Sequence, residues 1–257
     1  RQQTQTKVVG ITGSNGKTTV KEMTAAILGV ADPILFTRGN LNNDIGVPLT
    51  LFRLEAQHQY AIIEMGANHQ GEIAYVSRCA DADVVIISNA GAAHLEGFGS
   101  LEGVSRAKGE IIETLKPTGF AILNRNDTYY PYWLSVAGQR KSINFGTHPE
   151  AEIRAEEINF GIVEKQFLTR FKLVTPQDSI QISLALAGHH NVVNALAAAA
   201  AALALGISLN QIQQGLATLK PVTGRLQPLV GRQGNIIIDD TYNANPSSLK
   251  AGIEVLL

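Results

Sequence analysis

Residues 8–23, VVGITGSNGKTTVKEM, contain the groups that a phosphate-binding loop requires. In such a loop, glycines let backbone N–H groups converge on an anion, a lysine meets the outer phosphates and a hydroxyl binds Mg²⁺. The candidate residues are Gly13, Ser14, Asn15, Gly16, Lys17, Thr18 and Thr19. The distance from Gly10 to Gly16 is one residue longer than the usual Gly-x-x-x-x-Gly-Lys spacing. Because the chemical groups are all present, we interpret this stretch as a nucleotide-binding loop.

The segments on either side of the loop support this interpretation. An apolar run at residues 8–11 is suited to a buried strand, and apolar residues recur at helical spacing through residues 20–28, before Gly29. Strand, glycine loop and helix form the required setting. The alternative is a plain glycine-rich turn, but Gly-Lys-Thr seldom has both flanks by chance.

Composition limits the classes of partner. The chain has 257 residues, 45% of them hydrophobic, so it can bury a sizeable core. A net charge of −1 gives no basic field for nucleic acid or an anionic membrane. The longest apolar run, residues 195–205, is well short of the roughly 20 residues that span a bilayer. A single cysteine, Cys79, excludes an internal disulfide, and we expect a cytoplasmic protein.

Strand and helix patterns alternate through about residue 146, which is typical of a parallel α/β sheet. Strands are expected at residues 60–65, 84–88, 120–123 and 142–145, with helices at 72–79 and 101–115. Apolar residues then alternate with polar ones at 167–173 and 180–186, which predicts antiparallel strands with one wet face. Two helices are expected next, at 191–205 and 209–219. The fold class is therefore α/β: a mostly parallel sheet flanked by helices, with a small antiparallel sheet.

A boundary is predicted near Pro221 and Gly224, and it divides the chain at residues 1–222 and 223–257. Beyond the boundary, residues 235–238 resemble a new strand and residues 246–257 a new helix. This pattern suggests the beginning of a second, Rossmann-like α/β domain that is incomplete in this chain.

Polar residues follow several of the expected strands, at the edge where ligands gather in open α/β sheets. Glu64 could hold Mg²⁺, and its alternative is a surface glutamate at a strand end. Asn89 and His94 follow the strand at 84–88, where an imidazole could bind a metal or cap the next helix. Asp239 and Asp240 suit a ribose hydroxyl, a metal-bound water or a turn.

Several segments together resemble successive motifs of the Mur ligase family. They are GITGSNGKTT, GNLNNDIGVPLTL, IIEMGANHQGEI, NAGAAHLEGFGSLEGVSRAKGEI, GHHNVVNALAAAAA, TGRLQP and DDTYNANPSS, and they cover nearly the whole chain. GSNGKTT alone is also compatible with other Mur-type ligases, cyanophycin synthetase or folylpolyglutamate synthase. GNLNNDIGVP and AHLEGFGS resemble most closely the member of the family that adds D-alanyl-D-alanine. The family's own loop has the longer spacing found here.

The resemblance implies an ATP-dependent, ADP-forming ligase of peptidoglycan synthesis, with Mg²⁺ as its metal. ATP would phosphorylate the terminal carboxylate of UDP-N-acetylmuramoyl-tripeptide, and the amine of D-alanyl-D-alanine would attack the acyl phosphate. Phosphorylation gives the carboxylate a leaving group that it otherwise lacks. The approach of two anions requires positive charge at their meeting point.

The resemblance also assigns residues to the reaction. Lys17 and two Mg²⁺ ions would supply the positive charge, with Thr18 and Glu64 as ligands of one ion and His94 of the other. Lys108 resembles the family lysine that is carbamylated, and as a carbamate it could hold Mg²⁺ or orient its waters. From the residues alone, Lys108 could equally be a solvated helix lysine paired with Glu102 or Glu110.

The remaining site assignments concern the nucleotide and the peptide substrate. Adenine would meet Asn191 and Asn194, the phosphates Arg225, the ribose Asp240, and the amino-sugar peptide Asn40, Asn42 and Asn43. Helix capping is the alternative for one of the two asparagines at 191 and 194, alongside His189 or His190.

Complete family members have further domains, so we expect this chain to be part of a longer protein and not to complete ligation alone. Two other functions stay open: an isolated nucleotide-binding module, and a simple P-loop kinase or ATPase. The oligomeric state is not predicted.

Overall fold

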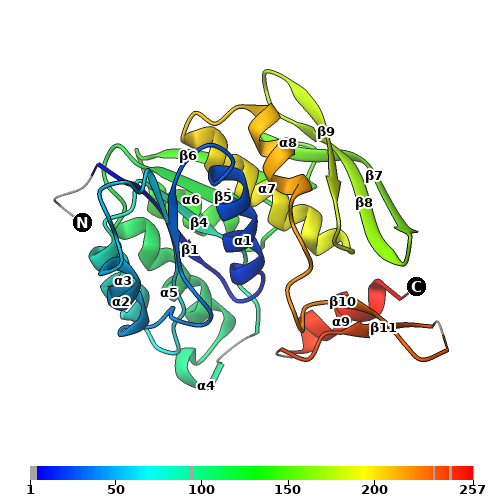
Figure 1. The fold of residues 1–257 in the computed structure, drawn as a ribbon. Helices are drawn as coiled ribbons and strands as arrows, with labels where there is room; N and C mark the ends of the chain where they lie inside the picture. Colours follow the sequence, from blue (N-terminus) through cyan, green and yellow to red (C-terminus); the bar gives the residue numbers. More distant parts are fainter. Residues whose placement is uncertain (1–4, 93–94, 234, 243–244, 257) are drawn as a thin grey trace.

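The computed structural model describes residues 5–92, 95–233, 235–242 and 245–256. Its centre is a nine-stranded sheet with the order β2-β3-β1-β4-β5-β6-β7-β8-β9 (Figure 1). The strands are β1 Lys7–Thr12, β2 Ile34–Phe36, β3 Tyr60–Glu64, β4 Val84–Ile87, β5 Phe120–Asn124, β6 Lys141–Gly146, β7 Ile153–Val163, β8 Gln166–Val174 and β9 Ser179–Leu184. The mostly parallel α/β sheet predicted from the sequence is confirmed.

The first six strands in the chain are parallel, and β1 lies between β3 and β4. Val8, Val9 and Ile11 of β1 are completely buried, because helices cover both faces of the sheet. The carboxyl ends of these strands lie at one edge, where Thr12, Glu64 and Asn124 are the last residues of β1, β3 and β5. That edge is the part of the fold that positions polar side chains.

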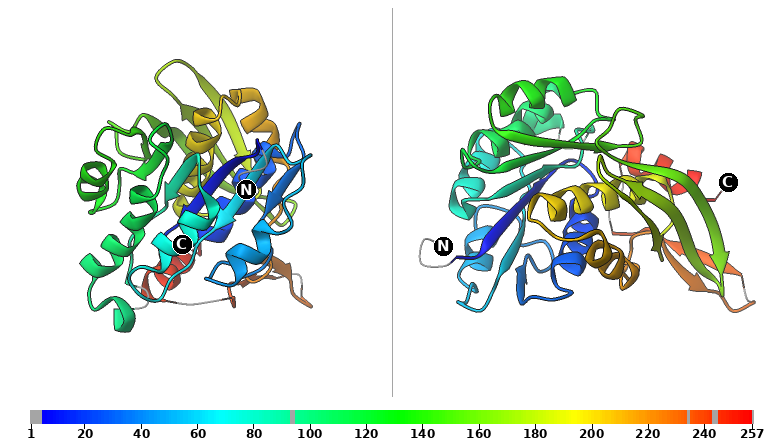
Figure 2. Two further views of the ribbon diagram at one scale, coloured as in Figure 1. Left: turned by 90° about the vertical axis from the view of Figure 1, so that its left-hand side faces the viewer. Right: turned by 90° about the horizontal axis from the view of Figure 1, so that it is seen from above.

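Strands β8 and β9 are the predicted antiparallel strands, and β7 pairs antiparallel with β8. Phe167, Phe171 and Leu173 are buried, whereas Gln166 before them and Arg170 between them are exposed, as the alternation predicts. The sequence did not predict that β7 pairs in parallel with β6 and so joins these strands to the main sheet. Figure 2 shows them extending the sheet away from β1.

Two groups of helices cover the sheet. On one face lie α1 Lys17–Leu28, α7 His189–Ala204 and α8 Leu209–Ala217. On the other lie α2 Gly46–Leu51, α3 Glu72–Ala80, α5 Leu101–Glu113 and α6 Tyr130–Ala137, with the short α4 Leu95–Phe98 packed near α5. Figure 1 shows this division into two layers. None of the helices in the described ranges is both long and apolar enough to cross a bilayer.

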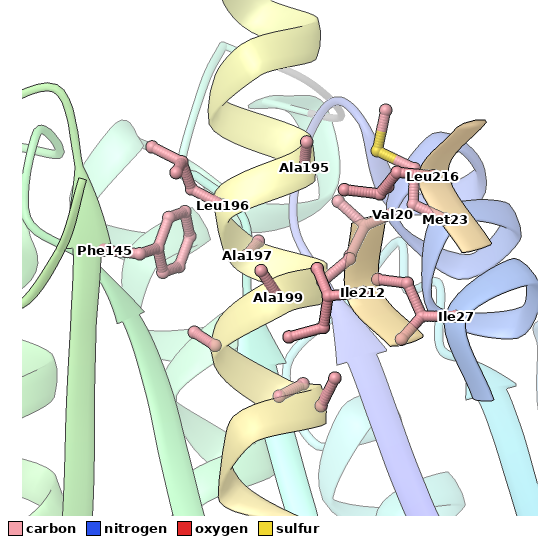
Figure 3. Packing of buried hydrophobic residues seen from close by; sticks show 14 of the residues in the cluster. Val20, Met23, Ile27, Phe145, Ala195, Leu196, Ala197, Ala199, Ile212 and Leu216 are labelled. Carbon is pink, nitrogen blue, oxygen red and sulfur yellow. The ribbon is translucent and has the colours of Figure 1, made fainter. Parts of the chain in front are cut away.

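The alanine-rich helix α7 is buried between the sheet and helix α1. Ala195, Ala197 and Ala199 are fully buried, and Figure 3 shows them between Phe145 of the sheet and the apolar side chains of α1 and α8. Small side chains allow this close approach. Gly215 of α8 serves the same purpose, because a Cβ atom there would overlap the Cα atom of Ile27 in α1.

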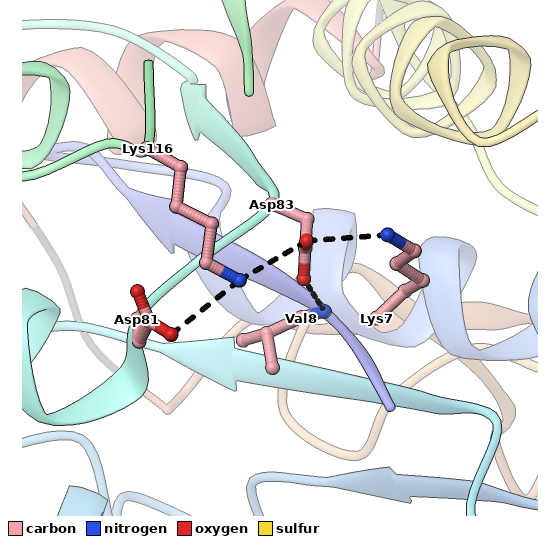
Figure 4. A network of polar contacts seen from close by, with 5 residues as sticks. All are labelled: Lys7, Val8, Asp81, Asp83 and Lys116. Carbon is pink, nitrogen blue, oxygen red and sulfur yellow. Dashed lines mark hydrogen bonds and ion pairs between the residues drawn. The ribbon is translucent and has the colours of Figure 1, made fainter. Parts of the chain in front are cut away.

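A charged network joins the strands at the opposite edge of the sheet. The Asp83 carboxylate accepts hydrogen bonds from the backbone N–H of Val8 (2.9 Å) and from Nζ of Lys116 (3.1 Å), and Lys7 Nζ lies at 3.4 Å (Figure 4). Lys116 also pairs with Asp81 at 3.4 Å. The network fixes the start of β4 beside the start of β1.

After the main sheet, the chain forms a hairpin of β10 Gln227–Val230 and β11 Ile236–Asp239, then helix α9 Pro246–Glu254. The sequence predicted β11 and α9 but not β10, because Pro228 lies within it and proline argues against a strand. Also not predicted were β2, α2, α4, α6 and β7. The domain division at residue 222 stays a prediction.

Candidate active site

A cleft of about 700 Å³ opens at the carboxyl ends of the parallel strands. Of the residues predicted for the site, it is lined by Ser14, Asn15, Gly16, Lys17, Thr18, Thr19, Asn42, Asn43, Glu64, Lys108, Asn191, Asn194, Arg225 and Asp240. Gly13 and Asn40 are not among its lining residues, and Asn40 is exposed. His94 lies outside the described residues. Segments far apart in the sequence thus meet in one cavity.

The glycine loop lies between β1 and α1, and its shape depends on two glycines. Gly13 has φ 151° and Gly16 has φ 81°, a backbone region that glycine adopts readily. A Cβ atom on Gly13 would overlap Oγ of Ser88, and one on Gly16 would lie 2.5 Å from Oδ1 of Asn194. The glycines therefore let the loop pass close to two neighbouring segments.

The loop after β4 holds the glycine loop in place. Ser14 donates its N–H to the carbonyl of Asn89 (3.0 Å), and Asn15 donates its N–H to Oδ1 of Asn89 (2.9 Å). Ser88 Oγ donates to the carbonyl of Asn15 at 2.7 Å. Asn89 contacts this loop through both its backbone and its side chain, so it shapes the site.

Lys17 is the first residue of α1, and its side chain folds back over the loop. Its Nζ donates to the carbonyls of Gly13 (2.7 Å) and Ser14 (3.2 Å). Burial lowers the pKa of Lys17, the Glu64 carboxylate opposes this shift, and the Arg225 guanidinium adds to it. The cleft therefore brings together two basic side chains, Lys17 and Arg225, and the carboxylate of Glu64.

Glu64 is buried with one carboxylate oxygen unpaired. The residue is 2% exposed, and its Oε1 accepts a hydrogen bond from Nδ2 of Asn42 at 2.8 Å. Oε2 is buried and has no hydrogen-bond partner among the described residues. A buried unpaired carboxylate oxygen is costly, so a cation beside it would be stabilised. Glu64 is not the surface residue of the alternative interpretation.

Lys108 is also buried, in helix α5. It is 2% exposed, and its Nζ lies 5.4 Å from the centre of the Phe98 ring. Burial, and then the charge of Lys17, lower the pKa of Lys108 to about 7, although Glu110 and Glu72 oppose the shift. The alternative of a solvated lysine is wrong.

The two glutamates that might have paired with Lys108 are engaged elsewhere. Glu110 accepts hydrogen bonds from the N–H groups of Gly71 (2.7 Å) and Ala74 (3.0 Å) at the start of α3. Glu102 pairs with Arg106 at 2.6 Å. The described contacts thus leave the Lys108 amine facing the cleft.

Asn191 and Asn194 lie in the first turns of α7 and are both buried. Asn191 Nδ2 donates to the carbonyl of Ala187 at 2.7 Å, and the N-cap residue of the helix is Gly188, without a side-chain cap, so this contact is not the helix capping of the alternative interpretation. Asn194 Nδ2 lies 3.3 Å from Oδ1 of Asn191. The pair forms one wall of the cleft beside Gly16.

The C-terminal segment contacts the glycine loop directly. Arg225 Nη2 donates to Oγ1 of Thr18 at 3.1 Å, and Asn245 Nδ2 donates to Oδ1 of Asn15 at 2.7 Å. The Arg225 guanidinium also lies 4.2 Å from the centre of the Tyr242 ring. Asp240 accepts a hydrogen bond from the N–H of Leu226 at 3.2 Å.

Some lining residues had no predicted role. They include Glu22, Glu72, Asn124, Asn126, Lys220, Tyr242 and Asn245. Tyr242 and Asn245 lie in the segment DDTYNANPSS, just after β11, so their position after a strand was a usable signal. The signal for Asn124 was the same, since it ends β5.

The donor set fits a hard cation. Among the described residues, no three His, Cys, Asp or Glu side chains come together as a metal cluster. The Thr18 hydroxyl and the unpaired Glu64 oxygen are oxygen donors, which suit Mg²⁺, an ion that usually takes few protein ligands together with phosphates and waters.

Comparison with known proteins identifies the family. Residues 11–202 match the family described as the Mur ligase middle domain. The chain belongs to the Mur ligase family. It is 48% identical over 257 residues to the UDP-N-acetylmuramoyl-tripeptide--D-alanyl-D-alanine ligase of Escherichia coli (strain K12), covering 100% of this chain and 56% of that protein.

Solved structures of Mur ligases have the same fold. The chain is similar to MurF from Acinetobacter baumannii, with a TM-score of 0.92 and 45% identity over 98% of this chain and 54% of that one. It is also similar to MurF ligase from Thermotoga maritima in complex with ADP, with a TM-score of 0.83 and 28% identity over 98% of this chain and 57% of that one. The chain spans about half the length of these relatives.

Proposed function

We propose that this chain forms the ATP-binding and carboxylate-activating part of a ligase that adds D-alanyl-D-alanine to UDP-N-acetylmuramoyl-tripeptide. The observation that carries the proposal is the unpaired, buried Oε2 of Glu64 in the same cleft as Lys17 and Thr18 of the glycine loop. The name of the Escherichia coli relative supports the choice of substrates.

The glycine loop is proposed to bind the phosphates of ATP. The N-terminus of α1 provides unpaired N–H groups and a positive dipole, and Lys17 adds a positive charge. Arg225 already lies beside Thr18 at the loop, so it is placed to meet a phosphate. Adenine is proposed to meet Asn191 and Asn194, and ribose Asp240.

Thr18 and Glu64 are proposed to hold Mg²⁺, with Lys108 and His94 proposed as ligands of a second ion. When bound, Mg²⁺ supplies charge neutralisation around the phosphates. The residues of this chain orient the reactants: Asn42 holds Oε1 of Glu64, which leaves Oε2 directed to a ligand. Lys108 is proposed to act as a carbamate, since a protonated amine there would repel a cation.

The proposed reaction has two steps. A carboxylate oxygen of the tripeptide attacks the γ-phosphorus and ADP leaves, which gives an acyl phosphate. The amine of D-alanyl-D-alanine then attacks the acyl carbon, the nitrogen loses a proton, and inorganic phosphate leaves. Lys17 stabilises the charge on the transferring phosphoryl group.

Asn40, Asn42 and Asn43 are proposed to face the amino-sugar peptide. Asn43 Oδ1 accepts the N–H of Gly46 at 2.8 Å, which fixes the start of α2. Asn42 donates to Oε1 of Glu64 and lines the cleft beside it. Asn40 is exposed, so its proposed contact depends on the substrate reaching the edge of the cleft.

The proposal is tested with a full-length protein that contains this chain. Phosphate release should require ATP, UDP-N-acetylmuramoyl-tripeptide and D-alanyl-D-alanine together, and mass spectrometry should detect the pentapeptide product. Phosphate release with ATP alone would favour an ATPase. Phosphate transfer to the tripeptide that never depends on the dipeptide would favour a kinase.

The 257-residue chain alone is expected to give no product, because the relatives that bear this name are nearly twice as long. Loss of the surfaces that align the substrates can cost about 7–11 kcal/mol of barrier lowering. Turnover by this chain at the rate of the full-length protein would contradict that expectation.

A further inference from the structure

Lys21 is a buried lysine that the proposed reaction does not use. It lies one helical turn after Lys17 in α1, it is 1% exposed, and it is not among the residues that line the cleft. Lysine is seldom fully buried unless its charge is paired. Its Nζ lies 2.8 Å from Oε1 of Glu22 and donates to the backbone carbonyl of Thr37 at 2.9 Å.

Thr37 connects Lys21 to Glu64. Thr37 follows the three-residue strand β2, which is the edge strand of the sheet, and its N–H donates to the carbonyl of Ile62 in β3 at 3.0 Å. Its Oγ1 accepts the backbone N–H of Glu64 at 3.0 Å. Both Thr37 and Glu64 are buried, so water does not compete for the two hydrogen bonds that join Thr37 to β3.

The pairing with β3 explains why this contact is needed. The N–H of Glu64 bonds to Oγ1 of Thr37 and not to its carbonyl, so no described hydrogen bond from β3 satisfies that carbonyl, and a buried carbonyl without a partner is costly. Lys21 supplies the donor for Thr37 from the helix that also carries Lys17 and Thr18. Without that donor, the end of β2 would shift to regain a partner, and Oγ1 of Thr37 would shift with it.

We propose that Lys21 is a positioning residue for Glu64. Through Thr37, it fixes the strand that carries the Glu64 carboxylate relative to Thr18 in α1, and thereby sets the separation of the two oxygen donors. The inference rests on the proposed function, in which these two donors hold Mg²⁺. A purely structural lysine would stabilise the fold without a special effect on the metal.

The test compares Lys21→Met with Lys141→Met in this 257-residue chain. Methionine retains most of the apolar stem of Lys21 and removes its charge, and Glu22 can be solvated because its side chain is 32% exposed. Lys141 is an exposed lysine of β6 and serves as the control. Calorimetry measures ADP affinity in EDTA and then the affinity of the ADP complex for Mg²⁺.

For Lys21→Met, we expect ADP affinity in EDTA to stay within about twofold of the wild type, while the Mg²⁺ affinity falls about 10- to 100-fold, as for other residues that orient a metal ligand. Thr37→Val removes the hydroxyl but keeps the carbonyl, and it should give a similar loss. The double variant should lose less than the product of the two single effects.

The inference is overturned if both single variants bind Mg²⁺ as tightly as the wild type, or if each loses ADP affinity equally with and without Mg²⁺. Thr37→Val decides the outcome if Lys21→Met does not fold. A wild-type chain with no Mg²⁺-dependent ADP binding would overturn the proposed function and the inference with it, and that result is distinguishable because it appears before any substitution.

Discussion

At the scale of single residues, the cleft contains two lysines, the half-buried Lys17 and the buried Lys108, whose surroundings give them different tasks. Lys17 is held by the carbonyls of its own loop, which fix the position of its Nζ. Lys108 lies in α5 against an aromatic ring, and its pKa is lowered to about 7, chiefly by burial. With a pKa of about 7, a substantial fraction of Lys108 is neutral at neutral pH, and a neutral amine is the form that reacts with CO₂.

We predict that Lys108 forms a carbamate. Because its pKa is lowered to about 7, the neutral fraction of the amine grows as the pH rises through that value, and carbamate formation grows with it. Protein in ¹³C-bicarbonate should show a carbamate signal in ¹³C NMR that is stronger at about pH 8 than at about pH 6. Lys108→Met should remove the signal. A bare amine at alkaline pH with bicarbonate present would contradict the prediction.

At the scale of secondary-structure elements, helix packing around α1 positions the glycine loop. The helices α7 and α8 both contact α1, through buried alanines in one case and through Gly215 in the other. Since the loop leads directly into α1, a shift of this helix would move Lys17 and Thr18 together.

Gly215→Ala should destabilise the fold. Alanine favours a helix by about 1 kcal/mol over glycine, but the new Cβ atom would overlap backbone atoms of Ile27, which cannot move without shifting α1. Overpacking of this kind costs about 1–3 kcal/mol, so the net effect is a loss of stability. Urea unfolding measures it, with Gln214→Ala on the exposed face of α8 as the control. A stabilised Gly215→Ala would show that the helices can move apart freely.

The Asp83 network makes a stability contribution that depends on pH. Burial alone would raise the pKa of Asp83, but the hydrogen bonds from Val8 and Lys116 and the charge of Lys7 hold it below its usual value. The contribution is present above the ordinary pKa of about 4 and is lost as pH falls through the lower pKa of the folded state.

Asp83→Asn should therefore lower the free energy of unfolding at pH 7 by about 1–2 kcal/mol. The difference between variant and wild type should shrink at acidic pH, where the wild-type carboxylate becomes protonated. Chemical unfolding at several pH values measures this, with the exposed Asp44→Asn as the control. A difference that does not change with pH would contradict the role of the charge.

The sequence predicted elements whose pattern is local. The apolar residues of α1 recur at helical spacing, and Val20, Met23 and Ile27 are buried as expected. The strand β10 was missed because Pro228 conceals it, and the pairing of β7 with β6 was missed because no local pattern specifies which strands become neighbours.

The candidate site shows the same difference between local patterns, which could be predicted, and contacts between distant segments, which could not. Glycine, lysine and hydroxyl residues in one short loop could be recognised from their types and spacing. The positions of Asn89 and Asn245 after strands could mark them as edge residues, but their hydrogen bonds to that loop could not be predicted, since both come from segments that are distant in the sequence. Lys21 looks like an ordinary charged helix residue, and only the packing of β2 against α1 reveals that it is buried.

At the scale of the whole molecule, the cleft depends on segments from both ends of the chain. Arg225 contacts Thr18, and Asn245 contacts Asn15, so the C-terminal segment lies directly on the glycine loop. Lys17 and Arg225 are both basic, and the repulsion between them is stronger where the cleft excludes water. An anionic ligand between Lys17 and Arg225 would neutralise two positive charges at once.

The central claim, that this loop binds a nucleotide phosphate, is tested most directly by calorimetry with MgADP. The wild-type chain should bind MgADP, and Lys17→Ala should weaken binding about 10- to 100-fold, because it removes a charge-assisted contact to phosphate. Lys141→Ala, at an exposed position of β6, should leave the affinity unchanged. Equal affinity of the wild type and a folded Lys17→Ala variant for MgADP would contradict the account.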